Sequence, residues 1–221
     1  MLTLILPHFW IIVHEKRGRS FHVPLFMDLY KMDFDRHITY NNQGGTVMIE
    51  KLLKNCGNPQ GIGGKLILNA MNRGHAPLCD WVLHTVSWAD GANVLDVGCG
   101  GGANIDRMFQ KYPNCHIDGI DYSAESVKVS KKTNAARLNI SCEILQGNVM
   151  ELPYPNHTYD VATAIETVYF WPDVTDGFRQ IFRVLKPGGK VIVACEMSDP
   201  VQGDKWAKRC EGMTIYTAKQ L

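Results

Sequence analysis

The sequence has no long uninterrupted apolar run, which excludes a membrane-spanning helix of the usual length. The apolar stretch at residues 2–13 is broken by Pro7 and His8 and is too short to cross a bilayer as a helix. It also lacks the basic start and the small-residue cleavage site of a secretory signal. We therefore expect neither a membrane partner nor export.

The sequence also has no excess of charge of one sign, and its cysteines show no paired spacing. Lys and Arg total 23 against 22 Asp and Glu, and the basic residues are scattered, which argues against a nucleic-acid surface. The seven cysteines are dispersed with no Cys-x-x-Cys pair, as is typical of reduced thiols in a cytoplasmic protein. None of the eight histidines has a zinc-like partner spacing, so the sequence predicts no structural metal.

From residue 93 onward, apolar strand-like runs alternate with helix-like patterns. The expected strands are 93–97, 115–120, 142–146, 159–165 and 190–196. The expected helices are 102–112, 123–138 and 174–185, and a last amphipathic segment covers 204–221. This alternation predicts an α/β, Rossmann-like, doubly wound fold with a mostly parallel sheet and helices on both faces.

Two further parts are expected before the alternating region. Residues 1–46 are interpreted as an N-terminal extension, residues 47–90 as a helical cap or lid, and residues 91–221 as the Rossmann-like domain. The extension ends in a polar linker, and it has three open interpretations: a poorly ordered segment, a lid on the core, or a start codon placed too far upstream. The cap has helix-like patterns at 47–56, 65–72 and 77–88.

The most informative stretch is residues 94–102, Val-Leu-Asp-Val-Gly-Cys-Gly-Gly-Gly, where an apolar strand ends in a glycine cluster before a helix-like pattern. Glycines there let the backbone turn with positive φ, and they let a ligand approach main-chain N–H groups at a helix N-terminus. We interpret this turn as the site of a nucleotide-like cofactor. A plain tight turn is the alternative.

Two more positions point to such a cofactor. Asp121 ends the second strand, 21 residues beyond Gly100, where a carboxylate can accept both ribose hydroxyl protons. Helix capping is the alternative for Asp121, but Ser123 is the better N-cap. After the third strand, the Asn148 carbonyl can accept from an adenine amino group and the Val149 N–H can donate to the ring, or Asn148 simply forms a turn.

Four motifs, at residues 95–102, 119–123, 152–160 and 184–190, occur in a characteristic order. Together they resemble class I S-adenosylmethionine-dependent methyltransferases, in particular the small-molecule branch that includes quinone-biosynthesis C-methyltransferases. The resemblance covers about residues 91–196. It implies S-adenosyl-L-methionine as cofactor and in-line methyl transfer to a small-molecule acceptor.

The resemblance also implies roles for individual residues. It assigns the methionine portion to Asp96 and to the backbone of the turn, which includes Gly98, Cys99, Gly100 and Gly102. It assigns the ribose to Asp121, a flank of the adenine to Tyr122, and the adenine edge to Asn148 and Val149. The family more often has Asp in place of Asn148, whose amide oxygen can still accept a hydrogen bond.

Three residues are candidates for the catalytic side of the site. Glu166 follows strand 159–165, where it could touch the sulfonium or orient the acceptor. Tyr169 belongs to an aromatic trio that could wall the pocket, with core packing as the alternative. His75 could act as a base near neutral pH, and an exposed histidine without a partner is its alternative.

One expectation concerns the end of the sheet. The family usually has seven strands, of which the last two form an antiparallel hairpin beside the fifth, whereas this sequence ends at Leu221 before such a hairpin. We therefore expect the last strands to be missing and strand 190–196 to be an open edge, which would allow a homodimer. We favour a truncated protein as the explanation. The alternatives are a fragment of a longer protein, or an edge that the N-terminal extension or a second subunit covers.

Two other functions stay open. The chain could be a non-catalytic or crippled S-adenosylmethionine-binding module. A nicotinamide-dependent oxidoreductase is the weaker alternative, because Asp96 before the turn and the Lys-Pro-Gly-Gly segment at 186–189 speak against it.

Overall fold

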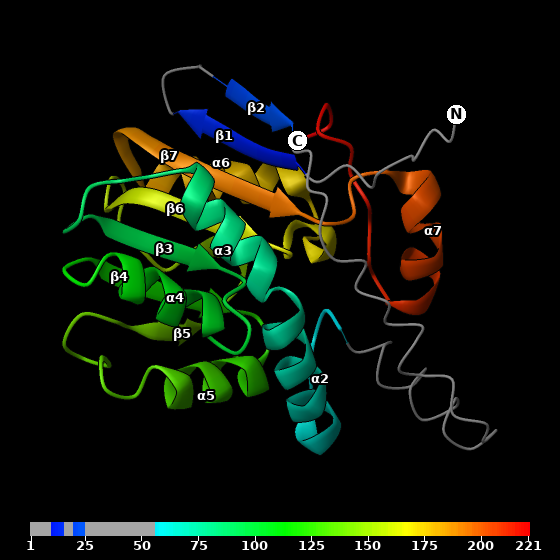
Figure 1. Cartoon of the computed structure of the whole chain (residues 1–221), viewed down its shortest axis with the longest axis horizontal. Coiled ribbons are helices and arrows are strands. Elements are labelled where there is room, and N and C mark those ends of the chain that lie inside the picture. Colours follow the sequence, from blue (N-terminus) through cyan, green and yellow to red (C-terminus); the bar gives the residue numbers. More distant parts are fainter. Residues whose placement is uncertain (1–9, 16–19, 25–55) are drawn as a thin grey trace.

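The computed structural model describes residues 10–15, 20–24 and 56–221. One mixed sheet has the strand order β2-β1-β7-β6-β3-β4-β5, with helices on both faces (Figure 1). The strands are β1 Trp10–Glu15, β2 Ser20–Pro24, β3 Asn93–Val97, β4 His116–Asp121, β5 Ile144–Gln146, β6 Tyr159–Ile165 and β7 Leu185–Cys195. The five strands from β3 to β7 pair in parallel, which confirms the predicted Rossmann-like α/β fold.

The helices largely follow the predicted positions. They are α2 Gly61–Gly74, α3 Ala76–Thr85, α4 Ala103–Lys111, α5 Ala124–Thr133, α6 Val174–Val184 and α7 Pro200–Arg209, with short 3-10 turns η1 Val149–Glu151 and η2 Val168–Phe170. The predicted linker at 39–46, and all but the last residue of the predicted helix at 47–56, lie outside the described residues. No helix in the described part of the chain is long and apolar enough to cross a membrane.

Two apolar layers hold the sheet between the helices. On one face, α3 and α4 pack buried side chains against the sheet, among them Val82 and Phe109 against Val94. On the other face, Ile181 of α6 packs in a second layer that contains Leu95. Val94 and Leu95 serve opposite layers because successive side chains of a strand point to opposite faces. Burial of each such side chain contributes about 1.5–3 kcal/mol to folding.

The N-terminal strands cover the far side of β7. β1 pairs antiparallel along β7, from Trp10 opposite Cys195 to Glu15 opposite Lys190, and β2 pairs with β1. The prediction of an open edge at 190–196 is therefore wrong, and a homodimer has no unpaired β7 edge to use. The row of N–H and C=O groups on β7 needs a partner, and the apolar, β-branched sequence of β1 is well suited to supply one.

Some predicted boundaries differ from the structure. α5 ends at Thr133 and not at residue 138. After Thr133 the chain turns toward β5. The predicted amphipathic segment 204–221 is helical only as far as Arg209. Beyond it the chain turns at Gly212, whose φ of +74° is incompatible with a continued right-handed helix.

Candidate active site

The glycine turn after β3 has the shape that the sequence predicts. Gly98, Gly100 and Gly102 all have positive φ, of +74°, +52° and +77°. At Gly98 a Cβ would overlap the side chain of Thr167, so only glycine fits this position. The main-chain N–H groups of Gly98 and Cys99 donate to the Ile120 carbonyl, which fixes the turn against β4.

Asp121 lies at the carboxyl end of β4, next to this turn. Its Oδ2 accepts from the Gly100 N–H at 2.8 Å and its Oδ1 from the Ser123 N–H at 2.9 Å. The N-cap of α5 is Ser123, whose hydroxyl accepts from the Ser126 N–H, so capping does not account for Asp121. Burial raises the pKa of Asp121 above its usual range. The carboxylate therefore ties the glycine turn to the end of the second parallel strand.

A cavity of about 530 Å³ opens at the carboxyl ends of the parallel strands. Seven of the predicted site residues line it: Gly98, Gly100, Asp121, Tyr122, Asn148, Val149 and Glu166. Its wall also includes the segment Cys56–Pro59, together with Leu68 and Met71 of α2. Sequence reasoning missed this segment, because it is far from the glycine turn along the chain and carries no motif of its own.

The other predicted residues lie behind the cavity wall as the described residues form it. Asp96 is buried within the sheet, where its Oδ1 accepts from the Thr163 hydroxyl at 2.7 Å and its Oδ2 has no hydrogen-bond partner among the described residues. Burial raises the pKa of Asp96 to about 7. Cys99 is buried against Ser130, and Gly102 is the N-cap of α4. These three residues can support the turn rather than touch a ligand in the cavity.

The adenine end of the predicted site combines an amide with apolar surfaces. The Asn148 Oδ1 accepts from the Met150 N–H at 3.0 Å and caps η1, and the second lone pair of this oxygen is left to accept from an adenine amino group. Ile120 and Val149 offer apolar cavity walls, and Tyr122 is 61% exposed at the rim. The turn and the adenine contact are thus compatible interpretations of Asn148.

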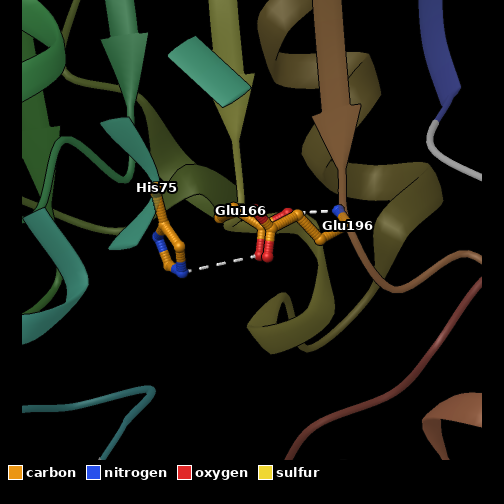
Figure 2. A group of neighbouring side chains, drawn as sticks. All are labelled: His75, Glu166 and Glu196. Atoms are coloured by element: carbon orange, nitrogen blue, oxygen red, sulfur yellow. Dashed lines mark hydrogen bonds and ion pairs between the residues drawn. The ribbon is translucent and has the colours of Figure 1, made fainter. Parts of the chain in front are cut away.

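Beside the cavity, His75, Glu166 and Glu196 converge from three separate elements, and we call them the acidic cluster (Figure 2). His75 Nε2 lies 3.8 Å from Glu166 Oε2, and the Glu196 N–H donates to Glu166 Oε1. Burial raises the pKa of Glu166 to about 7, and burial together with the Glu166 charge does the same for Glu196. Burial lowers the pKa of His75, which favours its neutral imidazole.

Glu166 and Tyr169 are held firmly in this cluster. Glu166 has a φ of +59°, a left-handed conformation that costs a non-glycine residue free energy and is common at functional sites. The buried Tyr169 donates its hydroxyl to Glu166 Oε1 at 3.1 Å and accepts from the Met197 N–H at 2.8 Å. Tyr169 therefore positions Glu166 and does not wall the cavity, whereas Phe170 and Trp171 of the predicted trio do.

Sequence reasoning missed Glu196. It directly follows β7, so the rule that singled out Asp121 and Glu166, a carboxylate at the carboxyl end of a parallel strand, would have found it as well.

A family model described as a methyltransferase domain matches residues 95–193. Over these residues the chain resembles class I S-adenosylmethionine-dependent methyltransferases. A demethylmenaquinone methyltransferase of Listeria welshimeri is 38% identical over 112 residues, which cover 50% of this chain and 47% of that protein. The uncharacterized methyltransferase YdaC of Bacillus subtilis is 29% identical over 119 residues, which cover 54% of this chain and 64% of YdaC.

Among solved structures, the cyclase SpnF superposes with a TM-score of 0.56 at 28% identity, covering 81% of this chain and 69% of SpnF. The matched part of the chain spans 47% of the Listeria protein and 64% of YdaC, which is less than two thirds of each curated relative. The resemblance found in the four motifs is confirmed, and so is S-adenosylmethionine as the cofactor of this domain. The residues of the cavity fit this cofactor, since Gly100 and Asp121 line it together and Gly100 leaves open the space that a side chain would fill.

Proposed function

We propose that this chain transfers a methyl group from S-adenosylmethionine to a small-molecule acceptor. The observation that carries the proposal is that one cavity joins the glycine turn and Asp121 to Glu166 of the acidic cluster. A cofactor site and the titratable side chain of Glu166 therefore face the same space. The curated relatives named as methyltransferases support this reaction class.

The proposed binding roles follow the geometry of the cavity. Asp121 accepts from the ribose hydroxyls with its remaining lone pairs, and the glycine turn lets the methionine portion approach its main chain at Gly100 without meeting a Cβ. Asn148 and Val149 contact the adenine edge. The cofactor itself supplies a methyl group that is already activated on a sulfonium. The protein then has to align the acceptor and exclude water, and such positioning can contribute about 7–11 kcal/mol.

The proposed acceptor side is the acidic cluster. Glu166 orients the acceptor, Tyr169 holds Glu166 in place, and His75 takes up a proton if the acceptor arrives protonated. The neutral imidazole is suited to that task, and the Glu166 carboxylate at 3.8 Å stabilises the imidazolium that forms.

A second candidate is cofactor binding without methyl transfer. It is favoured by one observation: SpnF, which matches most of this chain, is named a cyclase and not a methyltransferase.

The experiment that separates these candidates uses S-adenosylmethionine labelled in its methyl group, incubated with the full chain and a small-molecule extract. We expect label in low-mass products, separated by chromatography, and none with heat-treated protein. Retention of labelled cofactor on the chain, with no labelled product from any extract fraction, would establish the second candidate instead.

The rate of methyl transfer should depend on pH through the acidic cluster. Since burial raises the pKa of Glu166 to about 7, this carboxyl is mostly protonated at lower pH and cannot stabilise a charged His75. We therefore expect the rate to rise as the pH passes upward through about 7 and then to level off. Initial rates for wild type and Glu166→Gln test this, and the same rise in the variant would contradict the assignment.

A further inference from the structure

We infer that His75, Glu166 and Glu196 form a binding site for a divalent transition-metal cation. One ligand atom from each of the three side chains lies within 4.8 Å of the other two. His75 comes from the junction of α2 and α3, Glu166 from the end of β6 and Glu196 from the end of β7 (Figure 2). Residues so far apart along the chain produce no metal-binding spacing, which is why the sequence predicts none.

The charge balance of the acidic cluster favours a cation. Two carboxylates lie in a half-buried pocket, and within the described part of the chain the cationic partner of Glu166 is His75 alone. An imidazole beside two carboxyl groups is a set of side chains that ligate divalent metals, and an ion between them would add positive charge where two acidic groups meet.

The hydrogen bonds around Glu166 resemble the second layer of a metal site. Its Oε1 accepts from the Tyr169 hydroxyl and from the Glu196 N–H, while Oε2 faces His75. Such outer partners orient a ligating carboxylate and leave one oxygen directed at the ion. The left-handed backbone of Glu166 is accounted for in the same way, because it aims the side chain at this position.

The ligand set indicates which ions the site would take. One nitrogen and two carboxylate oxygens suit Mn²⁺, Fe²⁺ or Zn²⁺ better than Ca²⁺ or Mg²⁺, which prefer oxygen ligands alone. Metal–ligand distances of about 2.0–2.2 Å require the three side chains to draw closer by rotation. If His75 is a metal ligand, it cannot also take up a proton from the acceptor. The ion would then promote loss of that proton itself, by polarising the oxygen of an acceptor hydroxyl. That last role rests on the proposed methyl transfer, whereas binding of the ion does not.

The test is a titration of the full chain with Mn²⁺ after the chain has been treated with a chelator. Electron paramagnetic resonance measures the concentration of free Mn²⁺ at each step. We expect one Mn²⁺ bound per chain, and affinity weakened at least about tenfold in Glu196→Gln, as for loss of a metal-site group. Glu151→Gln, at an exposed glutamate of η1, is the matched control and should bind Mn²⁺ like wild type.

The affinity for S-adenosylhomocysteine, measured on the same samples, shows whether each variant is folded. If Glu196→Gln is not folded by this measure, His75→Asn is used instead of it. Absence of bound Mn²⁺ at millimolar concentration in wild type would overturn the inference, as would equal affinity in a folded Glu196→Gln. Mn²⁺ binding without any labelled product would refute the proposed methyl transfer and leave the metal site standing.

Discussion

Replacing Asp121 by asparagine should weaken binding of S-adenosylhomocysteine by about 10- to 150-fold. A hydrogen bond to a charged group contributes about 1.5–3 kcal/mol, and each 1.4 kcal/mol changes affinity about tenfold. The Asp121 carboxylate makes two such hydrogen bonds, because its oxygens accept from the N–H groups of Gly100 and Ser123. Asp121 also lines the cavity, where it can accept from the cofactor. An asparagine NH₂ would confront one of these N–H donors. Calorimetric titration of both proteins measures the difference.

The matched control is Asp80→Asn. Asp80 is exposed on α3, where its carboxylate pairs with Arg107 on the surface, so the same chemical change removes only a surface ion pair. We expect its affinity for S-adenosylhomocysteine to equal that of wild type. If Asp121→Asn binds as tightly as Asp80→Asn, the assignment of Asp121 to the ribose is wrong.

Removal of residues 1–24 should cause the chain to self-associate. The deletion takes away β1 and β2 and leaves β7 with an unpaired edge next to the buried run Val191–Cys195. Such an edge is a template for pairing with other molecules, so size-exclusion chromatography should show large assemblies or loss of material. Retention of the wild-type elution volume would show that the β1–β7 pairing is dispensable.

Two variants serve as controls for the deletion. Removal of residues 1–9 leaves both strands in place and should preserve the elution volume. Ile12→Pro lies in the middle of β1, between His22 and Val193, and removes one N–H from the ladder. It should reproduce part of the effect of the larger deletion, as a lower melting temperature.

The parallel part of the sheet could be predicted from the sequence because its signals are local. Strands β3 and β6 begin and end where the apolar runs at 93–97 and 159–165 do. The glycine turn and Asp121 followed from the same logic, since a ligand site at the ends of parallel strands is a property of the topology.

What could not be predicted depends on contacts between distant segments. Nothing in the sequence of Trp10–Glu15 specifies β7 as its partner over any other strand edge. The acidic cluster is similar, because His75 meets Glu166 and Glu196 only once α2, α3 and the sheet are assembled. The pairing of a strand and the approach of a side chain are set by packing, which a single sequence shows only indirectly.

The pairing of β1 with β7 also constrains how this protein is made. Trp10 lies opposite Cys195, so the ribosome must synthesise all the residues between them before the two strands can meet. Contacts of such high sequence separation close late and slow the folding reaction. During synthesis β1 and β2 therefore lack their partner strand, and the edge of β1 stays open to incorrect pairing until β7 has been made.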